Sequence, residues 1–282
     1  MNEYRQALDF VHDTLSALRE EGVELRAGRG ALERLAAIPR TERTETTERT
    51  TAREPVLSVP SVPSVLPVRA PATGSRAERL AALRGPVLAC TRCPQLVKSR
   101  TQVVFGVGNP EAELMFVGEA PGEDEDRQGE PFVGKAGQLL TKIIEAMALR
   151  REDVYIANVL KCRPDMPPGM PGNRKPKPAE METCKPYLLE QIEIIQPRAL
   201  VALGATAMEG LLGETAPMAR LRARWHDFGG TPLMATYHPA YLLRNQSLSE
   251  KRKVWEDMLM VLEKLGKPIT DRQRNFFLRG AT

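Results

Sequence analysis

The chain has 282 residues, of which 42% are hydrophobic, so it is long enough to form one large domain or two small ones around a sizeable core. Its formal net charge of +4 permits a nucleic-acid partner without requiring one. No run of about 18 apolar residues is present, and the first residues lack the layout of a secretory signal, so we expect a cytoplasmic protein with no membrane span.

Residues 1–38 have the pattern of an amphipathic helix. The side chains of one face are Tyr4, Leu8, Val11, Leu15 and Leu18, which recur at alternating spacings of four and three residues. This is too short to identify a coiled coil. Two interpretations remain, a helix that packs on its own domain and a helix that binds an unknown protein partner.

Residues 39–76 differ sharply in composition. Threonines alternate with charged residues as far as Thr51, and Val-Pro-Ser repeats follow. No aromatic residue occurs in this segment, so it buries too little apolar surface to offset the entropy of ordering it. We predict a disordered linker.

Residues 77–267 have the pattern of a globular domain, followed by a tail at 268–282. Four strands are predicted at Glu113–Val117, Val154–Asn158, Ala199–Leu203 and Leu233–Thr236, with helices between them at Gln138–Leu149 and Ala179–Ile195. Such alternation predicts an α/β fold with a mostly parallel four-stranded sheet. Ligands of such sheets bind beyond the carboxyl ends of the strands.

Four cysteines are better explained as metal or cluster ligands than as disulfides, because cytoplasmic thiols usually stay reduced. Cys90 and Cys93 form a Cys-x-x-Cys pair, whereas Cys162 and Cys184 are single and distant. Structural zinc sites usually show two such pairs, and iron–sulfur clusters tolerate dispersed ligands. The spacing leaves zinc and a [4Fe–4S] cluster both open.

Two glycine-containing motifs follow the first predicted strand. Gly118-Glu-Ala-Pro-Gly-Glu-Asp-Glu-Asp126 combines a tight turn with a cluster of carboxylates, a pattern that is common in solvated turns. Gly129-Glu-Pro-Phe-Val-Gly-Lys-Ala136 approaches a phosphate-binding P-loop. It has Ala136 where a magnesium-binding hydroxyl belongs, and no strand leads directly into it, which argues against a nucleotide hydrolase.

Polar side chains also follow two later strands. Asn158 ends the second strand and offers both a donor and an acceptor, as reading the edge of a base requires, although a turn-capping Asn is the simpler explanation. His238 follows the fourth strand, where a structural role is equally common. The next residues offer an apolar wedge, Leu242 and Leu243, beside the cation Arg244.

Taken together, these motifs resemble the family-four, iron–sulfur uracil-DNA glycosylases. The resemblance covers about residues 85–265 and rests on Cys90-Thr-Arg-Cys93, the runs at 118–126 and 129–140, Asn158-Val-Leu-Lys-Cys-Arg-Pro164, Asn173-Arg174 and His238-Pro-Ala-Tyr-Leu-Leu-Arg244. It implies a three-layer α/β/α fold, a [4Fe–4S] cluster on Cys90, Cys93, Cys162 and Cys184, and a monomer that acts on uracil-containing DNA.

The resemblance also implies roles for the strand-end residues. We expect Phe132 to stack on the extruded uracil, Asn158 to read its edge, His238 to donate to its O2, and Gly118, Glu119 and Ala120 to line the pocket. Glu125, or else Glu119, is expected to orient the attacking water. Leu242, Leu243, Arg244, Asn173 and Arg174 are expected to contact DNA.

Two departures and two rival functions remain. The loop between Cys162 and Cys184 looks longer and richer in proline than the family's usual form, and Ala120 stands where related glycosylases carry a catalytic Asp. One rival is a non-catalytic nucleic-acid-binding protein that keeps the cluster. The other is a variant that traps uracil covalently, which the absence of any histidine between residues 127 and 225 disfavours.

Overall fold

The computed structural model describes residues 73–164, 166 and 172–278. The predicted N-terminal helix, nearly all of the predicted linker and the last four residues therefore lie outside the described residues. The described part begins with helix α3, Arg76–Leu88, whose start is fixed by a capping box. There the Ser75 side chain accepts from the backbone N–H of Glu78, while the Glu78 carboxylate accepts from the backbone N–H of Ser75.

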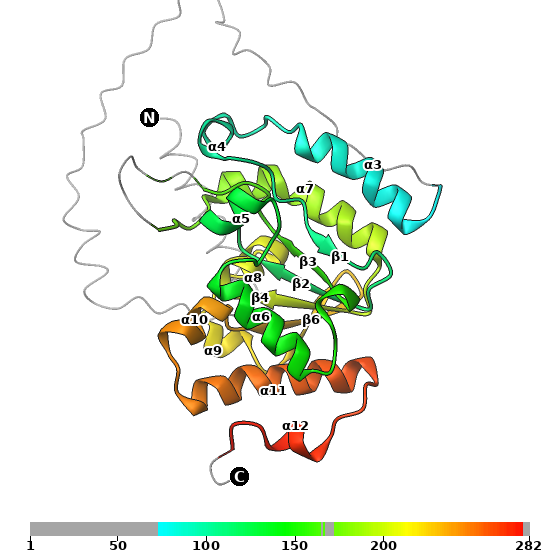
Figure 1. The fold of residues 1–282 in the computed structure, drawn as a ribbon, viewed down its shortest axis with the longest axis vertical. Helices are drawn as coiled ribbons and strands as arrows, with labels where there is room; N and C mark the ends of the chain where they lie inside the picture. Colours follow the sequence, from blue (N-terminus) through cyan, green and yellow to red (C-terminus); the bar gives the residue numbers. More distant parts are fainter. Residues whose placement is uncertain (1–72, 165, 167–171, 279–282) are drawn as a thin grey trace, which may run out of the picture. The chain divides into compact units, whose positions relative to one another are not determined.

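A single mixed sheet of six strands forms the centre of the described domain (Figure 1). The strand order is β1-β3-β2-β4-β6-β5, and the strands are β1 Val107–Gly108, β2 Leu114–Gly118, β3 Tyr155–Asn158, β4 Ala199–Leu203, β5 Trp225–Phe228 and β6 Thr231–Thr236. The four inner strands are parallel and are the four predicted ones. The prediction of four strands is wrong by two, because β1 and β5 add antiparallel edges.

Neither of the two added edge strands has the apolar run of residues from which the four inner strands were predicted. β1 is only two residues long, and β5 reads Trp-His-Asp-Phe with all four side chains at least partly exposed. Each is paired on one side only, so neither needs the continuous apolar run of a buried parallel strand. The inner strands β2, β3 and β4 are buried at every position.

Helices cover both faces of the sheet, which confirms the predicted three layers. Side chains alternate along each strand, so Met115 and Val117 of β2 face one core while Leu114 and Phe116 face the other. The first core includes residues of α3, α7 Pro178–Ile195 and α8 Ala205–Leu212. The second includes residues of α6 Lys135–Ala146 and α11 Leu248–Leu265.

Short helices complete the described chain. They are α4 Pro94–Ser99, α5 Glu123–Gln128, the 3-10 helix η1 Arg151–Asp153, α9 Met218–Leu221, α10 Pro239–Arg244 and α12 Asp271–Asn275. Helix α12, in the predicted tail, packs on the domain, because Trp255 donates to the Gln273 carbonyl and the Gln273 amide donates to the Ala146 carbonyl. No helix among the described residues combines the length and apolar character needed to cross a bilayer.

Candidate active site and cysteine centre

The carboxyl ends of the four parallel strands meet at one edge of the sheet. Gly118 at the end of β2 pairs with Asn158 at the end of β3, and Leu203 pairs with Thr236 on the other side. His238 lies two residues beyond β6, and its Cβ is 3.1 Å from the position that a Cβ on Gly204 would occupy. The register therefore brings the residues that follow β2, β3 and β6 to one edge of the sheet.

Phe132 covers this edge. Its ring lies 5.6 Å from the His238 ring, centroid to centroid, with the planes tilted by 32°. The absence of a side chain at Gly118 makes room for it, because a Cβ there would lie 2.6 Å from the Phe132 ring and 2.4 Å from Oδ1 of Asn158. Phe132 and Asn158 therefore both approach Gly118 closely, and His238 lies beside the Phe132 ring.

The loop that carries Phe132 is held by its neighbours. Phe132 has a φ of 55°, a left-handed conformation that costs a non-glycine residue free energy. The Glu125 carboxylate accepts from the backbone N–H groups of Val133 and Gly134, both at 2.9 Å, and from that of Gly122 at 3.0 Å. Arg151 donates to the Pro131 carbonyl at 2.6 Å. Glu125 is thus occupied in fixing the position of the Phe132 loop.

Asn158 has an unsatisfied oxygen. Its side chain is 2% exposed, and its Oδ1 has no hydrogen-bond partner among the described residues. A buried acceptor without a donor costs roughly 1–3 kcal/mol, so native structures rarely keep one without a purpose. The space beside Phe132 would satisfy this oxygen by receiving a ligand with an N–H group.

His238 is fixed in one tautomer. It is the N-cap of α10, and its Nδ1 accepts from the backbone N–H of Ala240 at 3.1 Å. Burial lowers the pKa of His238 to about 4, with a smaller contribution from Arg244. The imidazole is therefore neutral near pH 7, and because Nδ1 is the acceptor, the proton is on Nε2.

Glu119 lies directly after Gly118 and is half-buried. Burial raises the pKa of its carboxyl group, while a hydrogen bond with the Thr206 side chain and the charge of Lys175 act in the opposite direction. Unlike Glu125, the Glu119 carboxylate accepts from no backbone N–H group among the described residues, and its hydrogen bond is with the Thr206 side chain. Ala120 follows it, half-buried against the core beneath α7 and α8.

The four cysteines line one small cavity, together with Leu96, Arg100, Leu160 and Thr183. Cys162 and Cys184 are buried, and Cys90 and Cys93 are partly exposed. No group of three or more His, Cys, Asp or Glu side chains in the described part of the chain is arranged to hold a metal ion. The four thiols nevertheless line the same cavity, so the fold brings together cysteines that are far apart in the sequence.

Positive groups surround this cavity. Arg100 donates to Cys162 Sγ at 3.0 Å, and the backbone N–H of Lys161 donates to Cys184 Sγ at 3.2 Å. Arg92 hydrogen-bonds Cys90 and stacks on the Tyr187 ring at 4.2 Å. Burial is the largest cause that raises the pKa of Cys184 to about 12, although Lys161 acts in the opposite direction, so a thiolate there needs a bound cation. The chemistry of the site fits thiolates that carry a metal centre.

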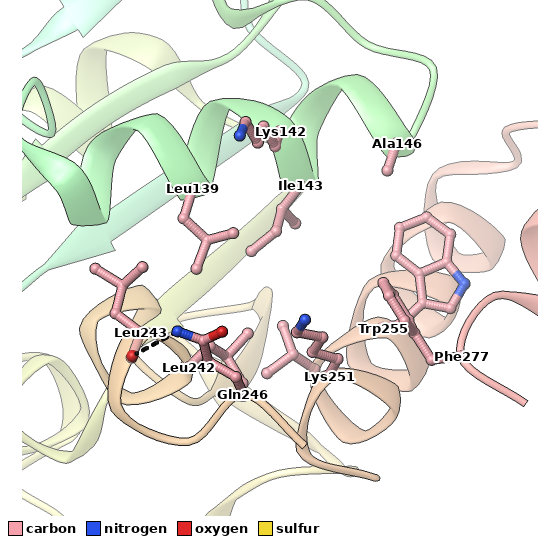
Figure 2. A pocket seen from close by; sticks show the side chains of 11 residues that line it. Leu139, Lys142, Ile143, Ala146, Leu242, Leu243, Gln246, Lys251, Trp255 and Phe277 are labelled. Atoms are coloured by element: carbon pink, nitrogen blue, oxygen red, sulfur yellow. Dashed lines mark hydrogen bonds between the residues drawn. The ribbon is translucent and has the colours of Figure 1, made fainter. Parts of the chain in front are cut away.

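The predicted DNA-contacting leucines differ in exposure. Leu242 is 5% exposed and packs inward, whereas Leu243 is 38% exposed. Both line an apolar pocket of about 360 Å³ between α6, α10 and α11, beside the strand-end site (Figure 2). In the figure, Leu139 and Ile143 point into this pocket from α6, and Leu243 and Gln246 face them.

Cations without partners gather around this pocket. Lys142 and Lys251 line it, and Arg244 follows Leu243. None of the three pairs with a carboxylate of the described residues, although other surface cations do, as Lys267 pairs with Glu113 at 2.6 Å. Such a group of unpaired positive charges beside an exposed leucine is a suitable surface for a polyanion.

Asn173 and Arg174 lie near the cysteine centre, away from this group. Asn173 Oδ1 accepts from Arg163 at 3.2 Å, and Arg174 forms an ion pair with the buried Glu180 at 2.7 Å. Glu180 in turn accepts from the backbone N–H of Lys177, directly before α7. Both residues order the segment that leads into α7.

Comparison with known proteins identifies the family. The model of the uracil DNA glycosylase superfamily matches residues 105–259. A type-4 uracil-DNA glycosylase of Thermotoga maritima is 47% identical over 186 residues, 65% of this chain and 93% of that protein. A type-4 enzyme of Archaeoglobus fulgidus is 44% identical over 58% of this chain and 83% of its own.

The chain belongs to the type-4 uracil-DNA glycosylases. A type-5 uracil-DNA glycosylase of Thermus thermophilus is more distant, at 30% identity over 53% of this chain and 82% of that protein. The matched superfamily segment contains the strand-end residues Gly118, Phe132, Asn158 and His238. It ends before α12 and begins after Cys90 and Cys93.

Several residues that shape the site of this type-4 glycosylase carry no sequence signal of their own. The sequence around Arg151 and Thr206 is ordinary for the start of a helix, and nothing near Lys161 distinguishes it from a surface lysine. Gly137 lies just before the predicted helix and within the observed α6. A Cβ there would lie 1.8 Å from the Phe132 carbonyl oxygen, so the close approach of α6 to the loop excludes any larger residue.

Proposed function

We propose that this chain is a uracil-DNA glycosylase that extrudes uracil from DNA and hydrolyses its N-glycosidic bond, the first step of base excision repair. One observation carries the proposal. The buried Oδ1 of Asn158, which has no hydrogen-bond partner among the described residues, lies close to the Phe132 ring, and the His238 imidazole lies beside that ring. Uracil supplies the missing donor, a π-face for the ring and a carbonyl oxygen for the imidazole.

Base recognition follows from these three groups. Asn158 Oδ1 accepts from N3–H of uracil while its amide donates to O4, a pattern that cytosine reverses. Stacking on an aromatic side chain is typically worth about 1–3 kcal/mol per base. Because Glu125 and Arg151 already fix the Phe132 loop, little of this stacking free energy is offset by the entropy cost of ordering the loop when uracil binds.

Bond cleavage uses His238 and Glu119. As the bond from the sugar C1′ to N1 breaks, its electron pair moves onto uracil and positive charge develops on the sugar. The neutral Nε2–H of His238 donates to O2 and stabilises the uracil anion. We assign Glu119 to hold the water that attacks C1′, to stabilise the positive sugar and to take the proton that the water loses. Glu125, expected from sequence to activate water, instead positions the Phe132 loop.

DNA is bound along α6, α10 and α11. Extrusion of a nucleotide costs a few kcal/mol. Leu243, the exposed leucine of the pair, inserts into the vacated space, and Leu242 supports it from the core. Arg244, Lys142 and Lys251 bind flanking phosphates, while Asn173 and Arg174 are placed to contact the strand nearer the cysteines.

The cysteine centre is proposed to hold a [4Fe–4S] cluster on Cys90, Cys93, Cys162 and Cys184. Four thiols around one cavity, with the Arg100 guanidinium beside Cys162, suit a group that is bound by four thiolates. The resemblance to the iron–sulfur, type-4 glycosylases favours the cluster over zinc. When bound, it supplies a cross-link between the entry to the domain, the end of β3 and α7.

The direct test uses an oligonucleotide with one uracil. After incubation with the protein, alkali cleaves abasic sites, so strand scission at the uracil position and release of free uracil are expected. Binding without scission would instead support the non-catalytic rival. A protein–DNA adduct that survives denaturation would support the covalent uracil-trapping rival.

Salt dependence tests the proposed DNA surface. Each phosphate contact contributes about 0.7 to the slope of log affinity against log salt on single strands and about 0.9 on duplexes. The double variant Lys142→Gln/Lys251→Gln is therefore expected to reduce this slope by about 1.4 on single-stranded and about 1.8 on duplex uracil-containing DNA. Lys267→Gln, at the opposite end of the sheet and paired with Glu113, is the matched control. Equal slopes for the double variant and the wild type would contradict this surface.

A further inference from the structure

A buried lysine connects the cysteine centre with the base-reading residue. Lys161 is 1% exposed, and its Nζ donates to the backbone carbonyl of Asn158 at 3.0 Å and to Gln191 Oε1 at 2.5 Å. Its own backbone N–H donates to Cys184 Sγ. The next residue is Cys162. Lys161 therefore adjoins one proposed cluster ligand in the chain, is hydrogen-bonded to a second, Cys184, and contacts the backbone of Asn158.

The surroundings of Lys161 explain how a buried ammonium is tolerated. No carboxylate of the described residues pairs with it, and an uncompensated buried charge is strongly unfavourable. Cys184, which carries negative charge when metal-bound, interacts electrostatically with the Lys161 ammonium. Gln191 extends the network, because its amide donates to the Phe105 carbonyl at 3.0 Å and to the Tyr155 hydroxyl at 3.2 Å.

We infer that Lys161 is a positioning residue for uracil recognition, which holds the end of β3 so that the Asn158 carboxamide faces the extruded base. This rests on the proposed function and deepens it. Beyond Asn158, the backbone N–H groups of Val159 and Leu160 still donate to the carbonyls of Gly118 and Glu119, both at 3.0 Å, whereas the Asn158 carbonyl accepts from the Lys161 side chain. The ammonium ties the Asn158 carbonyl to α7 through Gln191. The thiolate centre, which balances the charge, thereby stabilises the geometry of base reading without touching the base.

The test is a double-mutant cycle on single-turnover excision of uracil. Lys161→Met is expected to lower the excision rate at least about tenfold and to weaken binding of free uracil, which is measured separately by calorimetry. In an Asn158→Ala background, Lys161→Met should leave the excision rate almost unchanged, because Lys161 acts through Asn158. A merely structural lysine would lower both backgrounds by the same factor.

Controls keep the outcomes distinct. Iron and sulfide per chain are measured for every variant, and Lys267→Met is the matched lysine control. Lys161→Gln, which keeps a neutral N–H donor, provides a second cycle if the Met variant does not fold or loses its cluster. The inference would be overturned if the Lys161 substitution lowered the excision rate by the same factor in the wild-type and Asn158→Ala backgrounds, or lowered it in neither. An Asn158→Ala single variant that excises uracil at the wild-type rate would instead contradict the proposed base-reading role.

Discussion

His238→Ala is expected to lower single-turnover excision of uracil on the order of a hundredfold, with little change in DNA affinity. Loss of one preorganised donor to a developing oxyanion typically costs about 10²–10³ in rate. Here Nδ1 accepts from the backbone of α10, so Nε2–H is the donor aimed at the base. The rate is measured with enzyme in excess over an oligonucleotide containing one uracil.

The pH profile gives this prediction a second measurement. Because burial lowers the pKa of His238 to about 4, its ionisation lies below the usual assay range. The imidazole stays neutral as the pH rises from about 5 to 8, and His238 should add no inflection there. His226 in β5 provides a histidine control outside the site. Its Nε2 lies 2.8 Å from the carbonyl oxygen of Leu221 in α9. Unchanged excision by His238→Ala would exclude the assigned role.

Cys184→Ala is expected to abolish iron binding and to destabilise the domain. A tightly bound group at about 1,000 times its dissociation constant contributes roughly 4 kcal/mol to stability. For a domain of this size, that corresponds to a fall of about 8–16 °C in melting temperature. The buried Cys184 links α7 to the end of β3 through the Lys161 amide, so its loss affects both elements.

Iron and sulfide analysis of anaerobically purified protein accompanies this measurement. Thr183→Ala is the matched control, because Thr183 lines the same cavity without being a proposed ligand. It should retain iron and melt within a few degrees of the wild type. Zinc without iron in the wild-type protein would overturn the cluster, and a Cys184→Ala protein with full iron would overturn its ligand set.

The parallel core of the fold was predictable because burial on both faces leaves an unambiguous sequence signal. β4, Ala199–Leu203, is apolar throughout and was predicted to the residue. The edge strand β5 carries His226 and Asp227 and pairs on one side only, so nothing in its sequence separates it from a loop. Helix α12 is likewise polar, and its place is defined by tertiary contacts such as those with Trp255, Ala146 and Arg252.

The location of the site was predictable from the sequence, whereas the roles of its individual residues were less so. Strand ends placed Asn158 and His238 at one edge, because register and parallel direction follow from the fold. The sequence could not distinguish Glu125 from Glu119, since that depends on which carboxylate meets the backbone amides of Val133 and Gly134. Nor could it show that Leu242 is buried while Leu243 is exposed.

The most direct test of the central claim is the selectivity of Asn158→Asp. Excision of uracil and of cytosine is measured on otherwise identical oligonucleotides by the wild type and the variant. The wild type should remove uracil alone. The variant should lose most of this discrimination, because a carboxyl group lacks the fixed amide donor for O4 and, when protonated, matches the cytosine edge. A variant as selective for uracil as the wild type would contradict base reading by Asn158, and with it the assignment of this pocket to uracil.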